Sequence, residues 1–253
     1  MPALAALALL LWLLGLHPIA PAQLGGLGLV AALSPVLLLA YPLLIISVVL
    51  ELATPHPRQR LLAGLTTLGV LLVYGLQPAS EQTARISVSW LHAGFARYIA
   101  DHGHILTGFD ARFSWPGFFS LVAFVTRASG VPDATPLLRW APLVFAALAT
   151  LGMRALAVSV LGYKRVAWVA TWIFLLAEWT EQDYFSPQAT TYVMLLGALA
   201  VTARYLLRPG LVSPLRAHAW RRLPPASAPA DRLLAQAMIV LLALALAPPH
   251  QLT

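Results

Sequence analysis

Long apolar stretches alternate with short polar breaks along almost the whole chain. A helix that crosses a lipid bilayer needs about 20 mostly apolar residues. Seven stretches reach or approach this length: 2–16, 26–50, 61–77, 137–160, 166–180, 187–207 and 233–249. The pattern therefore predicts an all-α protein, a polytopic transmembrane helix bundle of about seven spans. Pro35 and Pro42 fall within the second stretch, so we expect that helix to be kinked.

The orientation of the predicted spans depends on segment 116–126, which is apolar but too short to cross a bilayer comfortably. If it does not cross and the N-terminus is cytoplasmic, ten of the 16 basic residues fall in cytoplasmic loops: Arg58, Arg60, Lys164, Arg165, Arg204, Arg208, Arg216, Arg221, Arg222 and Arg232. If it does cross, most of them move outside, which the positive-inside rule disfavours. We therefore expect residues 114–130 to form a juxtamembrane helix at the outer face.

This topology divides the chain into three parts. Residues 1–77 form N-terminal transmembrane helices, 78–138 form a large outer loop with juxtamembrane helices, and 139–253 form further transmembrane helices. The last part contains an outer turn at 181–187 and a basic cytoplasmic loop at 208–231. The expected location is the cytoplasmic (plasma) membrane, with a multi-pass chain. The first stretch lacks the basic segment of a signal peptide, so it is interpreted as an uncleaved helix.

Composition supports the membrane assignment, since 60% of the residues are hydrophobic and 10% are charged. Soluble proteins have roughly 45–50% and 25%. The net charge of +7 is concentrated beside the predicted spans, so it indicates the bilayer surface as partner and not nucleic acid. The chain has no cysteine, which excludes disulfides, thiolate metal sites and thiol catalysis.

The first candidate site lies in the predicted outer loop. Apolar residues recur at helical spacing between Ser87 and Ala100, which predicts an amphipathic helix on the membrane surface. Asp110, Arg112 and Trp115 follow, just before the juxtamembrane helix. Arginine grips a phosphate with two parallel hydrogen bonds, and a carboxylate can accept a proton from an attacking hydroxyl. The alternative interpretation is that Asp110 pairs with Arg112 or caps the following helix.

Metal binding is a further question for the same loop. Asp101-His102-Gly103-His104 contains the residue types that bind metals, but such a cluster after a helix is often a solvated turn. We therefore assign no metal ligand and no cofactor, and a requirement for a divalent metal stays open.

The second candidate site is the predicted outer turn. Three acids, Glu178, Glu181 and Asp183, lie within six residues. Pro187 begins the next helix with Ser186 as its N-cap, and the helix N-terminus could hold a phosphate or sugar hydroxyls together with two glutamines. The other candidate residues of this face are Gln182, Tyr184, Gln188 and, at the C-terminal tip, His250. The alternative is a capped turn whose acids face external water.

Several of these segments resemble the GT-C polytopic membrane glycosyltransferases. They are Ala96–Gly103, Gly130 with Leu138–Pro142, Trp115-Pro116-Gly117-Phe118-Phe119, and Gln182-Asp183-Tyr184-Phe185-Ser186-Pro187-Gln188. The last two motifs are similar to those of actinobacterial GT-C-like membrane proteins, and the resemblance covers about residues 85–207.

The resemblance implies transfer of a sugar from a polyprenyl-phosphate donor to a cell-envelope acceptor outside the cytoplasmic membrane, with an outer-loop carboxylate as base. Carried onto this chain, Asp183 or Asp110 is the catalytic base and Arg112 holds the donor phosphate. The other expected substrate-binding residues are Trp115, Glu181, Gln182, Tyr184, Gln188 and His250. The chain departs from the pattern early in the loop, where the family usually has an acid and this sequence has Ser89, Trp90 and His92.

Two alternatives stay open at this stage. One is a non-catalytic transporter or assembly subunit, in which Glu178 and Arg154 mark an ion or substrate path. The other is an incomplete, inactive family member, because the sequence ends at Thr253 directly after a predicted span.

Overall fold

The computed structural model describes residues 1–20, 23–26, 28–81, 83–84, 86–177, 183–207 and 227–246. Within these ranges the chain forms helices and no β-strand, so the predicted all-α class is confirmed there. Helix contacts divide the chain into two compact units, Met1–Arg85 and Ile86–Thr253. The second unit combines the predicted outer loop with the helices that follow it.

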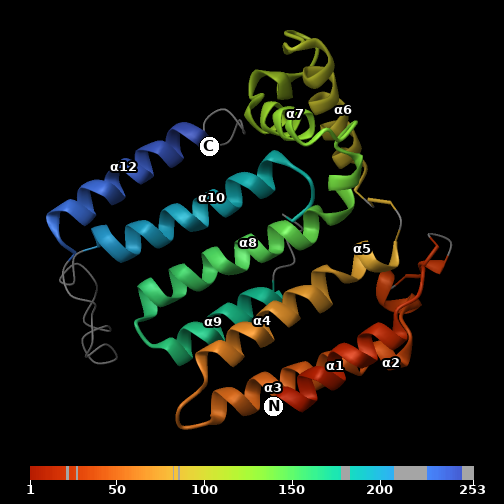
Figure 1. Ribbon diagram of the computed structural model, residues 1–253, viewed down its shortest axis with the longest axis vertical. Coiled ribbons are helices and arrows are strands. Elements are labelled where there is room, and N and C mark those ends of the chain that lie inside the picture. Colours follow the sequence, from red (N-terminus) through yellow and green to blue (C-terminus); the bar gives the residue numbers. More distant parts are fainter. Residues whose placement is uncertain are drawn as a thin grey trace. The chain divides into compact units, whose positions relative to one another are not determined.

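In its described residues, the first unit contains six helical segments. They are α1 (Pro2–Gly15), the 3₁₀ helix η2 (Leu29–Ala32), α2 (Pro35–Leu38), α3 (Ala40–Ala53), α4 (Gln59–Tyr74) and α5 (Leu76–Ser80). Helix α1 packs along α3 and α4 (Figure 1). The predicted kink is present as the break at Leu39 between α2 and α3, and Pro35 opens α2. Within the second stretch, only Pro35–Ala53 is a candidate membrane span.

Hydrogen bonds at the end of α4 connect three helices of this unit. The backbone oxygen of Leu72 accepts from Trp12 Nε1 at 3.2 Å and from Tyr41 Oη at 3.1 Å. Trp12 belongs to α1 and Tyr41 to α3. The last carbonyls of a helix have no partner within the helix, so these side chains supply one.

Close backbone contact fixes the end of α1 against α2. Ser34 Oγ caps α2 by accepting from Leu37 N at 3.2 Å, and it donates to the carbonyl oxygen of Gly15 at 3.0 Å. A Cβ atom added at Gly15 would lie 2.6 Å from both Leu37 N and Ser34 Oγ. Only glycine therefore fits at this position without displacing the backbone of α2.

The turn from α3 to α4 is fixed by an ion pair. Glu51 is fully buried near the end of α3 and accepts from Arg58 Nη2 at 2.7 Å and from Arg58 Nε at 3.1 Å. The backbone N–H of Arg58 donates to the same carboxylate at 2.7 Å. The buried charge is thus satisfied by one residue of the turn.

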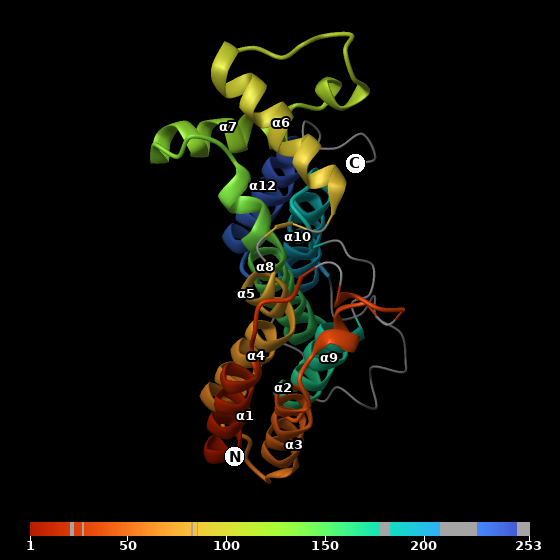
Figure 2. The same ribbon diagram turned by 90° about the vertical axis from the view of Figure 1, so that its right-hand side faces the viewer.

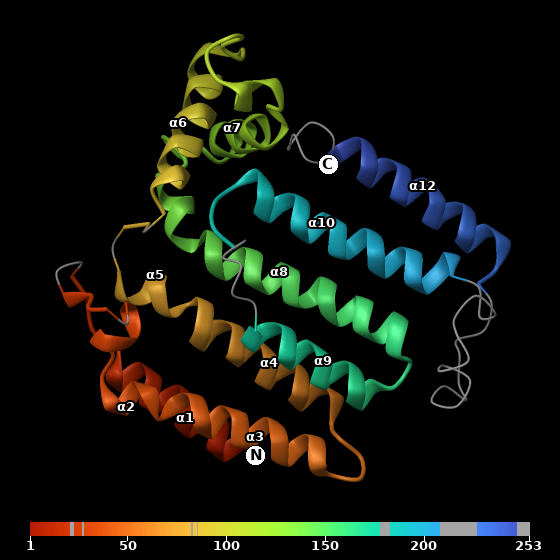
Figure 3. The same ribbon diagram turned by 180° about the vertical axis from the view of Figure 1, so that it is seen from behind.

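The second unit contains eight helical segments in the described ranges. They are α6 (Ser87–His102), the 3₁₀ helix η3 (Ala111–Ser114), α7 (Gly117–Ser129), α8 (Thr135–Leu161), α9 (Lys164–Ala177), α10 (Pro187–Val201), the π-helical segment η4 (Thr202–Leu206) and α12 (Pro229–Leu246). Helix α10 lies between α8 and α12, and α9 packs on α8 (Figures 1 and 3). Helix α7 runs across α6 (Figure 2).

Three described helices are long and apolar enough to cross a membrane: Pro35–Ala53, Thr135–Leu161 and Pro187–Leu206. Three shorter helices, Pro2–Gly15, Gln59–Tyr74 and Gly117–Ser129, are also apolar. These helices support the assignment of the chain as a membrane protein. The count of about seven spans and the N-terminal orientation are not established by these helices and stay predictions.

Candidate functional site

The buried face of α6 forms the base of the candidate site. Ser89, His92 and Phe95 are buried at helical spacing, together with Ala93 and Ala96. The helix is present as predicted, but of the apolar residues that predicted it Phe95 is buried and Leu91 is exposed. The helix ends at Gly103, whose φ of 75° is the left-handed conformation that glycine adopts readily. His92 is only 3% exposed, although histidine is a polar residue.

His92 connects α6 to the turn before α10. Its Nδ1 lies 3.0 Å from the backbone oxygen of Phe185. A carbonyl oxygen only accepts, so Nδ1 carries the proton and Nε2 of the neutral ring is unprotonated. The ring stacks on Tyr184 with centroids 6.3 Å apart and packs against Phe119 at 5.5 Å. Burial lowers the pKa of His92, partly opposed by the hydrogen bond to Phe185, so the ring is neutral near pH 7.

Asp110 and Arg112 form a two-point ion pair. Arg112 Nε donates to Asp110 Oδ1 at 2.8 Å and Arg112 Nη2 donates to Asp110 Oδ2 at 2.7 Å. Asp110 also caps η3, because Oδ1 accepts from the Arg112 backbone N–H at 2.8 Å. The Arg112 guanidinium lies over the Phe95 ring, 5.2 Å from its centroid. The structure thus contains the pairing that the alternative interpretation of this motif predicted, whereas Asp110 caps η3 and not the juxtamembrane helix α7, whose N-cap is Pro116.

The ion pair changes the chemistry expected of both partners. The side-chain hydrogen bonds from Arg112 lower the pKa of Asp110 to about 2, with a further contribution from the Arg112 backbone N–H. A carboxylate with such a pKa is a weak proton acceptor near pH 7. A phosphate at Arg112 would have to bind the remaining Nη1 or displace Asp110.

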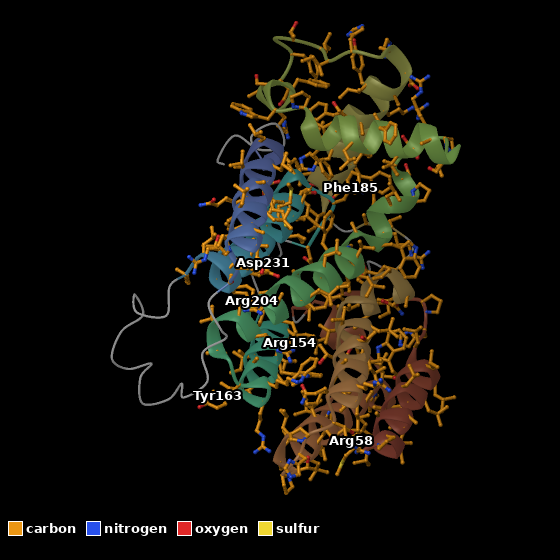
Figure 4. All side chains as sticks on the ribbon, turned by 60° about the vertical axis from the view of Figure 1, so that its left-hand side comes forward. Arg58, Arg154, Tyr163, Phe185, Arg204 and Asp231 are labelled. Carbon is orange, nitrogen blue, oxygen red and sulfur yellow. The ribbon has the colours of Figure 1, made fainter. Side chains whose placement is uncertain are left out.

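The turn leading into α10 has the predicted cap. Ser186 Oγ accepts from Ala189 N at 3.1 Å, and Pro187 occupies the first turn of the helix. Phe185, which is labelled in Figure 4, is buried. Its ring packs edge-on against that of Phe118 of α7, with centroids 5.1 Å apart. The hydrogen bond to His92 and this contact hold the turn against both α6 and α7.

The structure brings the two candidate motifs together. Tyr184 contacts His92 directly, and His92 lies within electrostatic range of Asp110 and Arg112. Asp183 precedes Tyr184 and is half-buried, and Trp115 directly follows η3. Three of the predicted site residues, Glu181, Gln182 and His250, lie outside the described residues, and so does Glu178.

Gln188 has an unsatisfied polar atom. Its Oε1 is buried in the first turn of α10 and has no hydrogen-bond partner among the described residues. A buried acceptor without a partner is costly, so a donor from a ligand would stabilise this arrangement.

Sequence reasoning assigned no site role to His92. Its signal was a histidine on the apolar face of the amphipathic helix, in the part of the loop where the resembling family usually has an acid. The described ranges contain no group of three or more His, Cys, Asp or Glu side chains that could hold a metal ion.

Comparison of the chain with known protein families, with curated proteins and with solved structures gives no match.

Proposed function

We propose that this protein is a GT-C-type membrane glycosyltransferase, which moves a sugar from a polyprenyl-phosphate donor to a cell-envelope acceptor at the outer face of the membrane. The observation that supports this most is the joining of the two sequence motifs. The hydrogen bond between His92 and Phe185, with the stack on Tyr184, joins the turn before α10 to α6, and Arg112 lies over Phe95 of the same helix. We infer that these two segments, which are far apart in sequence, contribute to one site.

The proposed roles follow from the state of each side chain. Asp183 is the proposed base. Asp110 does not take this role, because its pairing with Arg112 makes it a weak proton acceptor. Asp183 removes the proton of the acceptor hydroxyl, whose oxygen attacks the anomeric carbon of the donor sugar. The bond from that carbon to the polyprenyl phosphate breaks, and the lipid phosphate leaves with the electron pair.

The remaining residues bind and orient the substrate. Arg112 Nη1 interacts with the donor phosphate, and Gln188 Oε1 accepts from a sugar hydroxyl. Tyr184 stacks on the sugar ring, with Trp115, Glu181, Gln182 and His250 as further contacts. His92 is a positioning residue, because it holds the turn through the backbone of Phe185.

The proposal includes a multi-pass topology of about seven spans with a cytoplasmic N-terminus. It is supported by three helices of spanning length and by Lys164 and Arg165 at the turn between α8 and α9.

The test is binding and transfer with a polyprenyl-phosphate sugar, using the full chain in nanodiscs. Arg112→Gln should weaken donor binding roughly 10- to 100-fold, because one charge-assisted hydrogen bond contributes roughly 1.5–3 kcal/mol. Asp183→Asn should bind the donor normally and lower transfer roughly 100-fold or more. The matched controls are Arg232→Gln and Asp231→Asn on α12, which should leave donor binding and sugar transfer unchanged.

Two results would overturn the proposal. One is the absence of saturable donor binding by a wild-type chain whose folding is verified by a cooperative melt. The other is full transfer activity in Asp183→Asn.

A further inference from the structure

Helices α8 and α9 form a hairpin that contains a charged residue within a candidate membrane span. The turn follows Gly162, whose φ is 68°, and α9 starts at Lys164. Arg154 lies within α8, one of the candidate spans. An arginine in such a segment is costly unless it has a partner. No carboxylate of the described residues forms an ion pair with it.

The guanidinium of Arg154 is held inside the hairpin. It lies over the Trp168 ring of α9, 4.0 Å from the ring centroid. Its Nη1 is buried and has no hydrogen-bond partner among the described residues. An arginine that only extended along the helix to reach water would have its terminal nitrogens at the surface. The buried Nη1 therefore leaves a donor directed into the protein.

Helix α9 also carries a second unsatisfied donor. Trp172 is one helical turn beyond Trp168, about 6 Å along the axis, and both side chains are buried on the same face. Trp172 is 5% exposed, and its Nε1 also has no hydrogen-bond partner among the described residues. Two buried N–H donors with no acceptor are matched by an oxyanion, which accepts several hydrogen bonds and carries the opposite charge.

The position along the hairpin indicates a lipid phosphate. Arg154 is seven residues before Leu161, the last residue of α8, which corresponds to about 10 Å. Helix α8 has 27 residues and is about 40 Å long, which exceeds the roughly 30 Å hydrocarbon core. Arg154 can therefore lie near the headgroup level, on the side of the turn residue Tyr163 (Figure 4).

The surroundings suit an anionic phospholipid. Lys164 and Arg165 at the turn add positive charge, which attracts anionic headgroups. Leu151 of α8 and Ile173 of α9 are exposed and apolar, as required for contact with acyl chains. We propose that Arg154 and Trp172 form an oxyanion-binding site between α8 and α9, and that its occupant is the phosphate of an anionic phospholipid. This site shares no residue with the proposed glycosyl-transfer site, so either proposal can be refuted while the other stands.

The test is native mass spectrometry of the full chain in detergent, titrated with phosphatidylglycerol, with phosphatidylcholine of the same acyl chains, and with inorganic phosphate. The wild type should retain phosphatidylglycerol more tightly than phosphatidylcholine. Arg154→Gln should weaken phosphatidylglycerol binding about tenfold and Trp172→Phe a few-fold, as expected for one charged and one neutral hydrogen bond. The control Arg232→Gln, which removes a charge from α12, should leave phosphatidylglycerol binding unchanged.

A more conservative substitution at Arg154 provides a second test of the site. Arg154→Lys retains the charge but loses the planar fork, so we expect binding between that of the wild type and Arg154→Gln. If Arg154→Gln does not fold, Arg154→Lys and Trp172→Phe carry the comparison. Equal binding by these variants and the wild type would overturn the site. Equal retention of the two lipids, or displacement of phosphatidylglycerol by inorganic phosphate, would overturn the anionic lipid as its occupant.

Discussion

Replacement of Asp110 by asparagine should lower the free energy of unfolding by about 1 kcal/mol at pH 7. The pKa of Asp110 falls from 3.8 to about 2 in the folded protein. At about 1.36 kcal/mol for each pH unit, this sets an upper limit of about 2.4 kcal/mol for the ion pair. The Asp110 side chain is 22% exposed and that of Arg112 is 39% exposed, so solvent screening reduces the figure to about 1 kcal/mol.

The loss of unfolding free energy caused by Asp110→Asn should become smaller as the pH falls. A carboxyl group whose pKa is lowered by folding stabilises the folded state fully above its unfolded pKa, here 3.8. The stabilisation is lost as the pH falls through the folded value of about 2. The difference between wild type and Asp110→Asn should therefore be constant from pH 8 to about pH 5, and roughly halved at pH 3.

Thermal unfolding in detergent, followed by intrinsic fluorescence at pH 7, 5 and 3, measures this difference. The matched control is Asp101→Asn. Asp101 lies 3.6 Å from Arg97 on α6, and both side chains are more than half exposed. That change should alter the free energy of unfolding by less than about 0.5 kcal/mol. Equal effects of the two substitutions, or a difference for Asp110→Asn that does not shrink by pH 3, would refute the reasoning.

Two further predictions concern the first unit. Gly15→Ala should lower the free energy of unfolding by about 2 kcal/mol, because the added Cβ would collide with the backbone of α2. In the control Gly64→Ala the added Cβ meets nothing within 4 Å, so the change should be neutral or stabilising by up to about 1 kcal/mol. Chemical denaturation measures both variants, and equal effects would contradict the close contact at Gly15. Glu51→Gln should lower the melting temperature by about 3 °C at pH 7 by removing the charge that fixes the α3–α4 turn, and an unchanged melt would contradict that role.

Helical periodicity and capping residues predicted much of the local structure. The apolar spacing after Ser87 predicted α6, and Ser186-Pro187 predicted the start of α10. The prolines of the second stretch predicted a kinked helix, and the break lies at Leu39. These features depend on residues close in sequence, which is why the pattern contains them.

Contacts between distant segments could not be predicted in the same way. His92 and Phe185 are 93 positions apart, and a histidine on an apolar face gives no indication of which carbonyl it will meet. For Asp110 and Arg112 the sequence permitted either an ion pair or a phosphate site. The choice depends on side-chain geometry, here Arg112 lying over Phe95, which spacing does not determine.

The bonds to the Leu72 oxygen bear on how short a membrane-embedded helix can be. Helix α4 has 16 residues and spans about 24 Å, less than the hydrocarbon core. A helix end normally has to reach the headgroups, because its last carbonyls otherwise have no donor. Trp12 and Tyr41 provide donors from neighbouring helices at this end. For that carbonyl, an indole and a phenol take the place of water, so this end of α4 does not depend on solvent for a donor.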